Sequence, residues 1–182
     1  DIARQRDFAA ARKDQQALAA LVALAAGDAA AQRQARLLGA EIALAAGEAG
    51  EVGRWLAGSP LRRPEVLMLS QADLQLGGTA AATRSAERLQ LWVASHPRDA
   101  QAWQWLSSAR MALGQRLRAV RADAEAQWAL MDLAGAQDRF KAGQDLARAS
   151  AKDGNADHVE ASIIDTRARE VALLLREQAL ER

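Results

Sequence analysis

The stretch HPRDAQAWQWLSSARMALGQ, residues 96–115, contains one complete helix together with the signals for its two ends. Pro97 cannot continue a preceding helix, and Asp99 can cap the next one by accepting hydrogen bonds from free N–H groups of its first turn. Gly114 can adopt the left-handed conformation that closes a helix. Between these signals one stripe of side chains recurs at helical spacing: Trp103, Leu106, Arg110 and Leu113. The stretch therefore predicts a helix over 99–113 that buries one face.

The same pattern of apolar stripes separated by turn residues recurs along the rest of the chain. Gly27-Asp28, Gly47-Glu48 and Gly77-Gly78-Thr79 each predict the end of one helix and the cap of the next. Pro64 suits the first turn of a helix that follows the linker Gly58-Ser59-Pro60. About nine helices are expected, over residues 1–26, 28–46, 49–57, 64–76, 80–95, 99–113, 115–131, 132–149 and 156–180.

Composition supports an all-α chain and excludes several function classes. Half of the 182 residues are hydrophobic but only 4% are aromatic, so alanine, the strongest helix former, supplies much of the apolar surface. Runs of β-branched residues are almost absent, so we expect no sheet. The net charge of +1 argues against a general nucleic-acid binder. The chain has no cysteine, which excludes disulfides and thiolate metal sites, and no apolar run approaches the roughly 20 residues of a membrane helix.

Short connections between helices predict sequential antiparallel neighbours. The glycine stops at Gly27, Gly47, Gly77 and Gly114 are spaced irregularly around the roughly 34-residue period of tetratricopeptide repeats. Because each helical hairpin can bury its apolar stripe only by stacking on the next, we expect a right-handed solenoid of tetratricopeptide-like antiparallel hairpins. A compact helical bundle is the alternative packing.

The match to the tetratricopeptide consensus is partial. Four positions of the consensus are occupied as expected, by Pro97, Trp103, Leu106 and Ala119. Ser107 replaces the small glycine, whereas Arg110 replaces tyrosine and Asp123 replaces phenylalanine. The later Ala-x-x-x-Phe element is matched by Ala136 and Phe140 in the following hairpin. The helix over 115–131 is therefore expected to close one repeat and open another.

Several runs in the second half resemble a known family. They are RAVRADAEA (118–126), LAGAQDRF (133–140), GQDLAR (143–148) and SIIDTRARE (162–170). Together they resemble the C-terminal tetratricopeptide region of bacterial periplasmic M48-class zinc metalloproteases, which assist outer-membrane β-barrel assembly. The resemblance extends from Arg63 to Glu170.

The resemblance implies a non-catalytic arm in the periplasm that docks the protease on outer-membrane assembly machinery or on unfolded barrel substrates. In that family a preceding domain holds zinc with a His-Glu-x-x-His helix, and this chain has no such motif. We therefore expect no catalytic residue, no metal ligand and no cofactor in this chain. We expect one repeat domain over 1–182, a fragment of a longer protein, with N-terminal helices over 1–58, the best-matched repeats over 64–149 and a capping helix over 156–182.

Two surfaces are candidates for partner binding. If the repeat register holds, polar amide side chains and some apolar side chains line the inner face of the solenoid, a surface that suits an extended peptide. The residues expected on this face are Leu67, Gln71, Leu74, Gln101, Gln104, Ser108 and Met111. A basic patch forms around one hairpin end, from Arg110, Arg116, Arg118 and Arg121. A solvated, ion-paired face is the ordinary interpretation of this patch, and docking to an acidic surface is the alternative.

Other chemistry-bearing residues have ordinary structural explanations. His96 is expected in a solvated turn. His158 and Glu160 are expected to be a solvated pair in the first turn of a helix, because the cysteines that a zinc deaminase needs are absent. Asp123 and Glu125 are expected to form ion pairs on arginine-bearing helices. No glycine-rich loop follows a predicted strand, so we expect no phosphate-binding loop.

The two neighbouring tryptophans must differ in environment. Trp103 and Trp105 lie about 200° apart around a helix, so they cannot both face one neighbour. Trp103 belongs to the buried stripe. Trp105 is expected to pack, with Trp128 as a candidate neighbour, or to be an exposed anchor for a partner.

Two other functions remain open from the sequence. The first is a free-standing tetratricopeptide adaptor or chaperone-like scaffold that is unrelated to proteolysis. The second is a helical-bundle enzyme or small-molecule binder, which would need a buried pocket with convergent polar groups.

Overall fold

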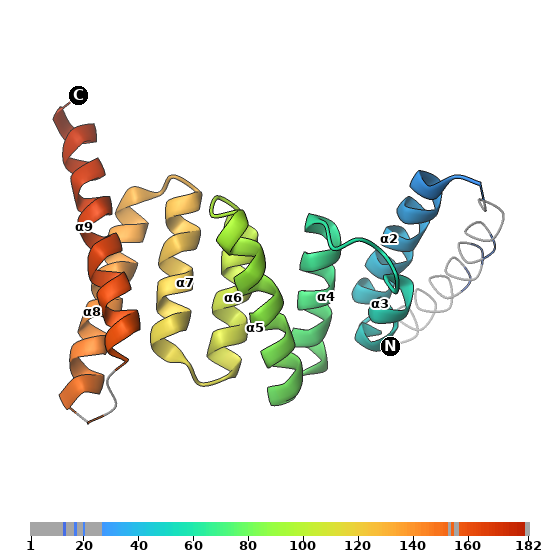
Figure 1. Ribbon diagram of the computed structural model, residues 1–182, viewed down its shortest axis with the longest axis horizontal. Coiled ribbons are helices and arrows are strands. Elements are labelled where there is room, and N and C mark those ends of the chain that lie inside the picture. The colour runs from blue at the N-terminus through green and yellow to red at the C-terminus, as the bar shows by residue number, and fades with distance from the viewer. Residues whose placement is uncertain are drawn as a thin grey trace, which may run out of the picture. The chain divides into compact units, whose positions relative to one another are not determined.

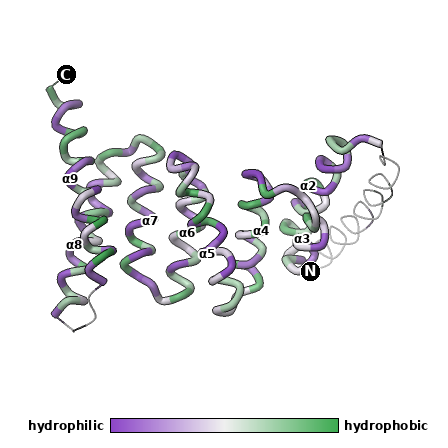
Figure 2. The backbone as a smooth tube through the Cα atoms, in the orientation of Figure 1, coloured by the Kyte–Doolittle hydropathy of each residue, from purple (hydrophilic) through white to green (hydrophobic). Residues whose placement is uncertain are grey.

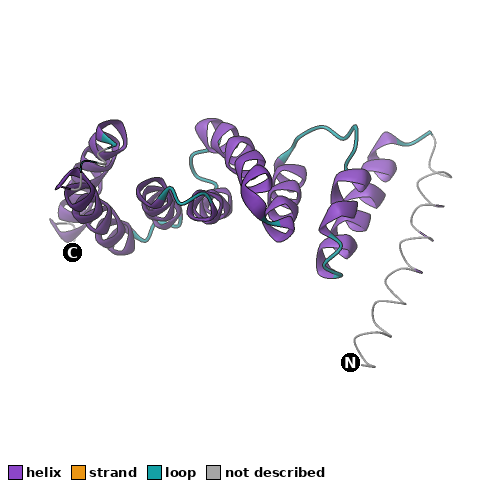
Figure 3. Ribbon diagram, turned by 90° about the horizontal axis from the view of Figure 1, so that it is seen from below, coloured by secondary structure: helices purple, strands orange, loops and turns teal. Residues whose placement is uncertain are grey.

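The computed structural model describes residues 27–152, 154 and 157–180, together with Lys13, Ala17 and Ala20. Within these residues the chain is helical and contains no strand (Figure 3). Eight helices are described (Figure 1): α2 (Ala29–Ala45), α3 (Ala49–Trp55), α4 (Arg63–Leu76), α5 (Gly78–Ser95), α6 (Ala100–Ala112), α7 (Arg116–Ala129), α8 (Leu133–Lys152) and α9 (His158–Leu180). The chain divides into two compact units, residues 1–81 and 82–182.

The first unit packs α2, α3 and α4 against one another, with successive helices antiparallel. Its core is rich in alanine and comprises Ala40, Ala43, Ala49, Val52, Leu56 and Ala72. Gly39 lies so close to Trp55 that an added Cβ would stand 2.4 Å from Cδ2 of the indole. Small residues on α2 therefore let α3 approach closely.

The turn between α5 and α6 is held by side chains of the stretch 96–115. Asp99 caps α6 by accepting a hydrogen bond from the backbone N–H of Ala102 at 3.3 Å, and it also accepts one from Nε1 of Trp92 at 3.0 Å. Nε1 of Trp103 donates to the carbonyl oxygen of Pro97 at 2.9 Å. Trp103 and Leu106 are buried, as the helical stripe predicts.

The remaining helices of the second unit contact one another in chain order, and α7 also contacts α9. Successive helices from α6 to α9 run antiparallel (Figure 1). One core cluster joins α7, α8 and α9, and it comprises Ala124, Ala136, Phe140, Ile164 and Val171. Hydrophobic and hydrophilic residues are interspersed along the helices of both units (Figure 2).

Most of the sequence-based helix boundaries are confirmed to within a few residues. Asp28 caps α2 through the N–H groups of Ala30 and Ala31, and Pro64 lies in the first turn of α4. Two predicted caps are wrong: Glu48 forms no side-chain cap on α3, and Thr79 lies inside α5 because the helix already begins at Gly78.

The predicted helix over 1–26 lies outside the described residues, except that Lys13, Ala17 and Ala20 are helical. Among the described residues, every helix is too short or too polar to cross a membrane.

Candidate docking site

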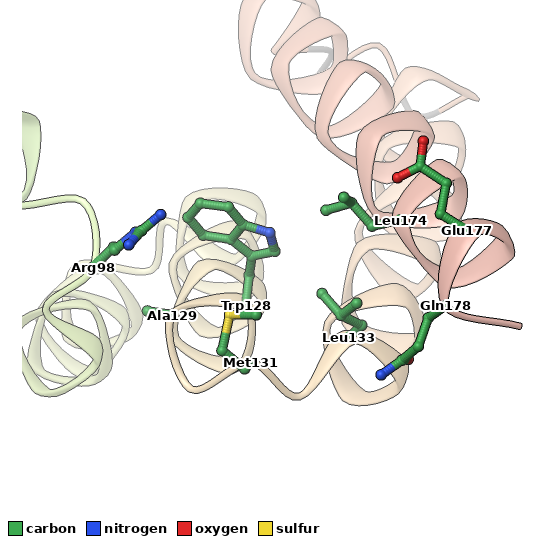
Figure 4. A pocket seen from close by; sticks show the side chains of 8 residues that line it. All are labelled: Arg98, Trp128, Ala129, Met131, Leu133, Leu174, Glu177 and Gln178. Carbon is green, nitrogen blue, oxygen red and sulfur yellow. The ribbon is translucent and has the colours of Figure 1, made fainter. Parts of the chain in front are cut away.

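A pocket of about 520 Å³ lies in the second unit, where the end of α7, the start of α8 and the last turns of α9 meet. Its wall is mainly apolar and is formed by Trp128, Ala129, Met131, Leu133 and Leu174. Figure 4 shows Trp128 and Met131 between Arg98 on one side and Leu174, Glu177 and Gln178 of α9 on the other. An apolar pocket with a few polar groups at its rim is the usual form of a binding site.

Met131 has an unusual backbone conformation for a residue with a side chain. Its φ angle is +63°, the only positive φ outside glycine among the described residues. Met131 donates its N–H to the carbonyl of Trp128 at 2.9 Å, and Asp132 donates to that of Gln127 at 3.0 Å, which together form a Schellman cap at the end of α7. The side chain of Met131 is 75% exposed, so it contributes little to the core.

The same cap occurs twice more in the chain with glycine at this position. Gly47 closes α2 and Gly114 closes α6, with φ angles of +75° and +71° and equivalent pairs of backbone hydrogen bonds. Glycine adopts this conformation without the steric cost that a Cβ brings. Methionine at position 131 is therefore not required by the turn itself.

Ion pairs between α7 and α9 hold the wall of the pocket in place. Arg167 donates two hydrogen bonds to the buried carboxylate of Glu125, and its guanidinium lies 4.5 Å from the ring centroid of Trp128. Arg121 pairs with the buried Glu160, and Arg118 pairs with Asp157 at 3.2 Å. Trp128 therefore both contacts Arg167 and lines the pocket.

Arg98 and Glu177 give the rim of the pocket opposite charges at opposite sides (Figure 4). Both side chains are exposed, and neither forms an ion pair with another residue in the described part of the chain. Charges in such positions fix the orientation of a bound partner more than they add affinity.

The predicted inner-face residues have different exposures. Leu67 is buried, so its side chain is not accessible, and Gln71 and Leu74 are half-buried in α4. The four residues on α6 share one exposed face: Gln101, Gln104, Ser108 and Met111. The residues of α4 and those of α6 belong to different units, and their assignment to one groove stays a prediction.

The residues of the predicted basic patch make different contacts. Arg118 and Arg121 form the ion pairs with α9 described above, and Arg116 is exposed. Arg110 is half-buried and donates to the side-chain oxygens of Gln115 at 2.8 Å and Gln90 at 3.4 Å. Burial lowers the pKa of Arg110, and the nearby charge of Arg118 lowers it further. Much of this basic surface is thus engaged within the chain.

The remaining candidates match their structural interpretations with one exception: Glu160, expected in a solvated first turn, is buried because it pairs with Arg121 of α7. His96 is exposed and stacks on Trp92 with ring centroids 3.7 Å apart, and His158 is exposed at the start of α9. Asp123 pairs with Arg139 at 3.0 Å, so the predicted ion pairing of Asp123 and Glu125 is confirmed. The described residues contain no group of His, Asp and Glu side chains that could hold a metal ion.

Three residues that line the pocket, Met131, Leu133 and Leu174, are not among the site residues predicted from the sequence. The helix over 115–131 ends without the glycine that closes other helices in the chain, and this absent glycine was the signal that could have drawn attention to Met131.

No protein-family model matches the chain, and no curated protein matches its sequence.

Proposed function

We propose that this chain is a protein-interaction domain whose tetratricopeptide-like hairpins stack into a right-handed solenoid. Two features support the proposal. Successive helices contact one another from α2 to α4 and from α6 to α9, and contacts between next-but-one helices, α2 with α4 and α7 with α9, accompany them. Stacked hairpins in repeat proteins bury their apolar faces in this manner.

The observation that carries an interaction function is the exposed apolar pocket at the end of α7. Met131 is 75% exposed and Leu174 is 39% exposed, and both lie beside the indole of Trp128. Apolar and aromatic side chains gathered around a pocket are typical of sites that receive an anchor residue from a partner protein.

The parent protein, by the resemblance of residues 63–170, is a periplasmic M48-class zinc metalloprotease that acts in outer-membrane protein assembly. On this proposal the chain is its non-catalytic arm, and zinc belongs to another domain.

A binding assay with two immobilised ligands tests the proposal. The ligands are purified barrel-assembly machinery and an outer-membrane barrel polypeptide kept unfolded, and a permanently unfolded soluble polypeptide is the control. We expect saturable binding of the chain to at least one of the first two and weaker binding to the control. Equal binding to all three, or binding to none, contradicts the proposal.

The parent assignment has its own test. A His-Glu-x-x-His motif is expected in the gene upstream of the region that encodes this chain. Its absence from the full-length protein would favour the free-standing adaptor.

A further inference from the structure

We propose that the pocket at the end of α7 binds a short peptide segment of a partner protein that presents a large apolar side chain between an acidic and a basic residue. This inference rests on the proposed interaction function and specifies the chemistry of the partner.

The apolar part of the pocket sets the central requirement. The indole of Trp128 and the side chains of Met131, Leu133 and Leu174 surround a space of about 520 Å³. That volume lies within the range of roughly 300–1,000 Å³ that binding pockets occupy. The pocket therefore has room for a large aliphatic or aromatic side chain together with part of its backbone.

Met131 is the residue that points most directly to a partner. It holds a left-handed conformation where Gly47 and Gly114 close the equivalent caps without a side chain. The methionine adds steric cost to the turn and leaves three quarters of its own side chain exposed. The flexible side chain of a methionine at the edge of an apolar pocket can change conformation to fit a bound side chain. Partner binding would therefore explain why an exposed methionine occupies this position.

The rim supplies the two charges of the proposed ligand. Arg98 lies on one side of Trp128, and Glu177 lies on the other, beyond Leu174 (Figure 4). Neither is engaged in an ion pair with the residues that the structure describes. A carboxylate of the peptide beside Arg98 and an ammonium or guanidinium group beside Glu177 complement this pattern.

Methyl NMR on the whole chain gives a direct readout, because the sequence contains only three methionines. Met131 lines the pocket, Met111 lies on the exposed face of α6, and Met68 lies in the first unit. The probes are three short synthetic peptides with a common central Phe-Leu pair and with Asp and Lys at opposite ends, Asp at both ends, or Lys at both ends. The peptide with opposite charges should shift the Met131 methyl signal at the lowest concentration and leave Met68 unchanged.

Variants test the individual contacts. M131G should weaken binding of the peptide with opposite charges about tenfold, whereas L91A, which truncates a similarly exposed apolar side chain on α5, should not. R98E should shift the preference towards the peptide with Lys at both ends by about two- to fivefold, and E177K should shift it towards the peptide with Asp at both ends. R176E is the control, because Arg176 is exposed on α9 and does not line the pocket.

The outcomes separate this inference from the proposed function. A shift of the Met111 methyl signal without one of Met131 would contradict peptide binding in the pocket and would place binding on α6. The proposed interaction function would then still hold. No shift at any methionine with any peptide overturns the pocket chemistry, and so does an unchanged affinity of M131G. The interaction function itself fails only if the barrel polypeptide and the assembly machinery also fail to bind in the assay above.

Discussion

Arg167 of α9 and Glu125 of α7 form a bidentate ion pair, with Nε 2.8 Å from Oε1 and Nη2 2.7 Å from Oε2. The hydrogen bonds to Glu125 raise the pKa of Arg167, against the opposing effect of burial. The same guanidinium covers one face of Trp128 at 4.5 Å from the ring centroid. One side chain therefore joins the packing of α9 on α7 to the wall of the candidate pocket.

R167M should lower the free energy of unfolding by about 2–4 kcal/mol, because it leaves the buried carboxylate of Glu125 without its partner. Urea denaturation measures the loss. R148M is the matched control, since Arg148 pairs with Asp145 on an exposed surface and should cost little. The double variant E125Q/R167M should lose less stability than the two single variants together, because it leaves neither charge unpaired. Equal stability of R167M and R148M would contradict a structural role for the pair.

The sequence could predict that Glu125 would be paired but not which arginine would pair with it. Glu125 lies on a helix with several arginines, and local spacing favours partners three or four residues away. The actual partner is 42 residues distant. It is brought close only by the register of α9 on α7, which depends on how Phe140 and Ile164 pack in the core between them. Local sequence signals predict where helices form. The register of one helix on another depends on tertiary packing, which those signals do not specify.

Lowering the pH should reduce the stability of the first unit, because Glu65 becomes protonated and loses its ion pair with Arg33. Burial raises the pKa of this carboxyl group, but hydrogen bonds from Arg33, the charge of Arg33 and backbone N–H groups outweigh burial, so its pKa lies below the ordinary value of 4.5. A lowered folded-state pKa contributes stability that is complete above the ordinary value and is lost as the pH falls through the lower one. The stability advantage of wild type over E65Q should therefore shrink between about pH 6 and about pH 3.

Urea unfolding at a series of pH values measures this difference. E41Q, at a position exposed on α2, is the control for removing one carboxylate from this unit. A difference between wild type and E65Q that stays constant across the range would mean that Glu65 has the same pKa in the folded and unfolded chain.

G39A should destabilise the first unit by about 1–3 kcal/mol, because the new Cβ would stand 2.4 Å from the indole of Trp55 and force the ring to move. Two glycines of α3 provide controls: a Cβ added at Gly50 or Gly53 meets open space. G50A and G53A should leave stability unchanged or raise it by up to about 1 kcal/mol. Thermal unfolding compares the three variants, and a G39A protein as stable as wild type would contradict the close packing of α2 on α3.

The candidate pocket could not be predicted from the sequence, and the reason differs from that for the partner of Glu125. The helix ends at Gly47 and Gly114 could be predicted because glycine commonly adopts the left-handed conformation that closes a helix. A methionine in the same position carries no such signal, since side chains rarely adopt a left-handed φ. Likewise, Leu174 lies in the apolar stripe of a long helix, a pattern that indicates burial. The structure leaves it 39% exposed, because α9 runs past the end of α7 beside the pocket.

M131G should raise the free energy of unfolding by up to about 1 kcal/mol, because the left-handed conformation costs a side-chain residue more than it costs glycine. The matched variant G114A, at the equivalent position of α6, should lower it by about 1 kcal/mol. Thermal and urea unfolding of both variants provide the measurement. The two caps have the same hydrogen bonds, so changes of opposite sign in the free energy of unfolding would show that Met131 destabilises the folded chain relative to glycine. If M131G instead destabilised the chain as much as G114A, Met131 would be a packing residue, and its left-handed conformation would no longer indicate a role in partner binding.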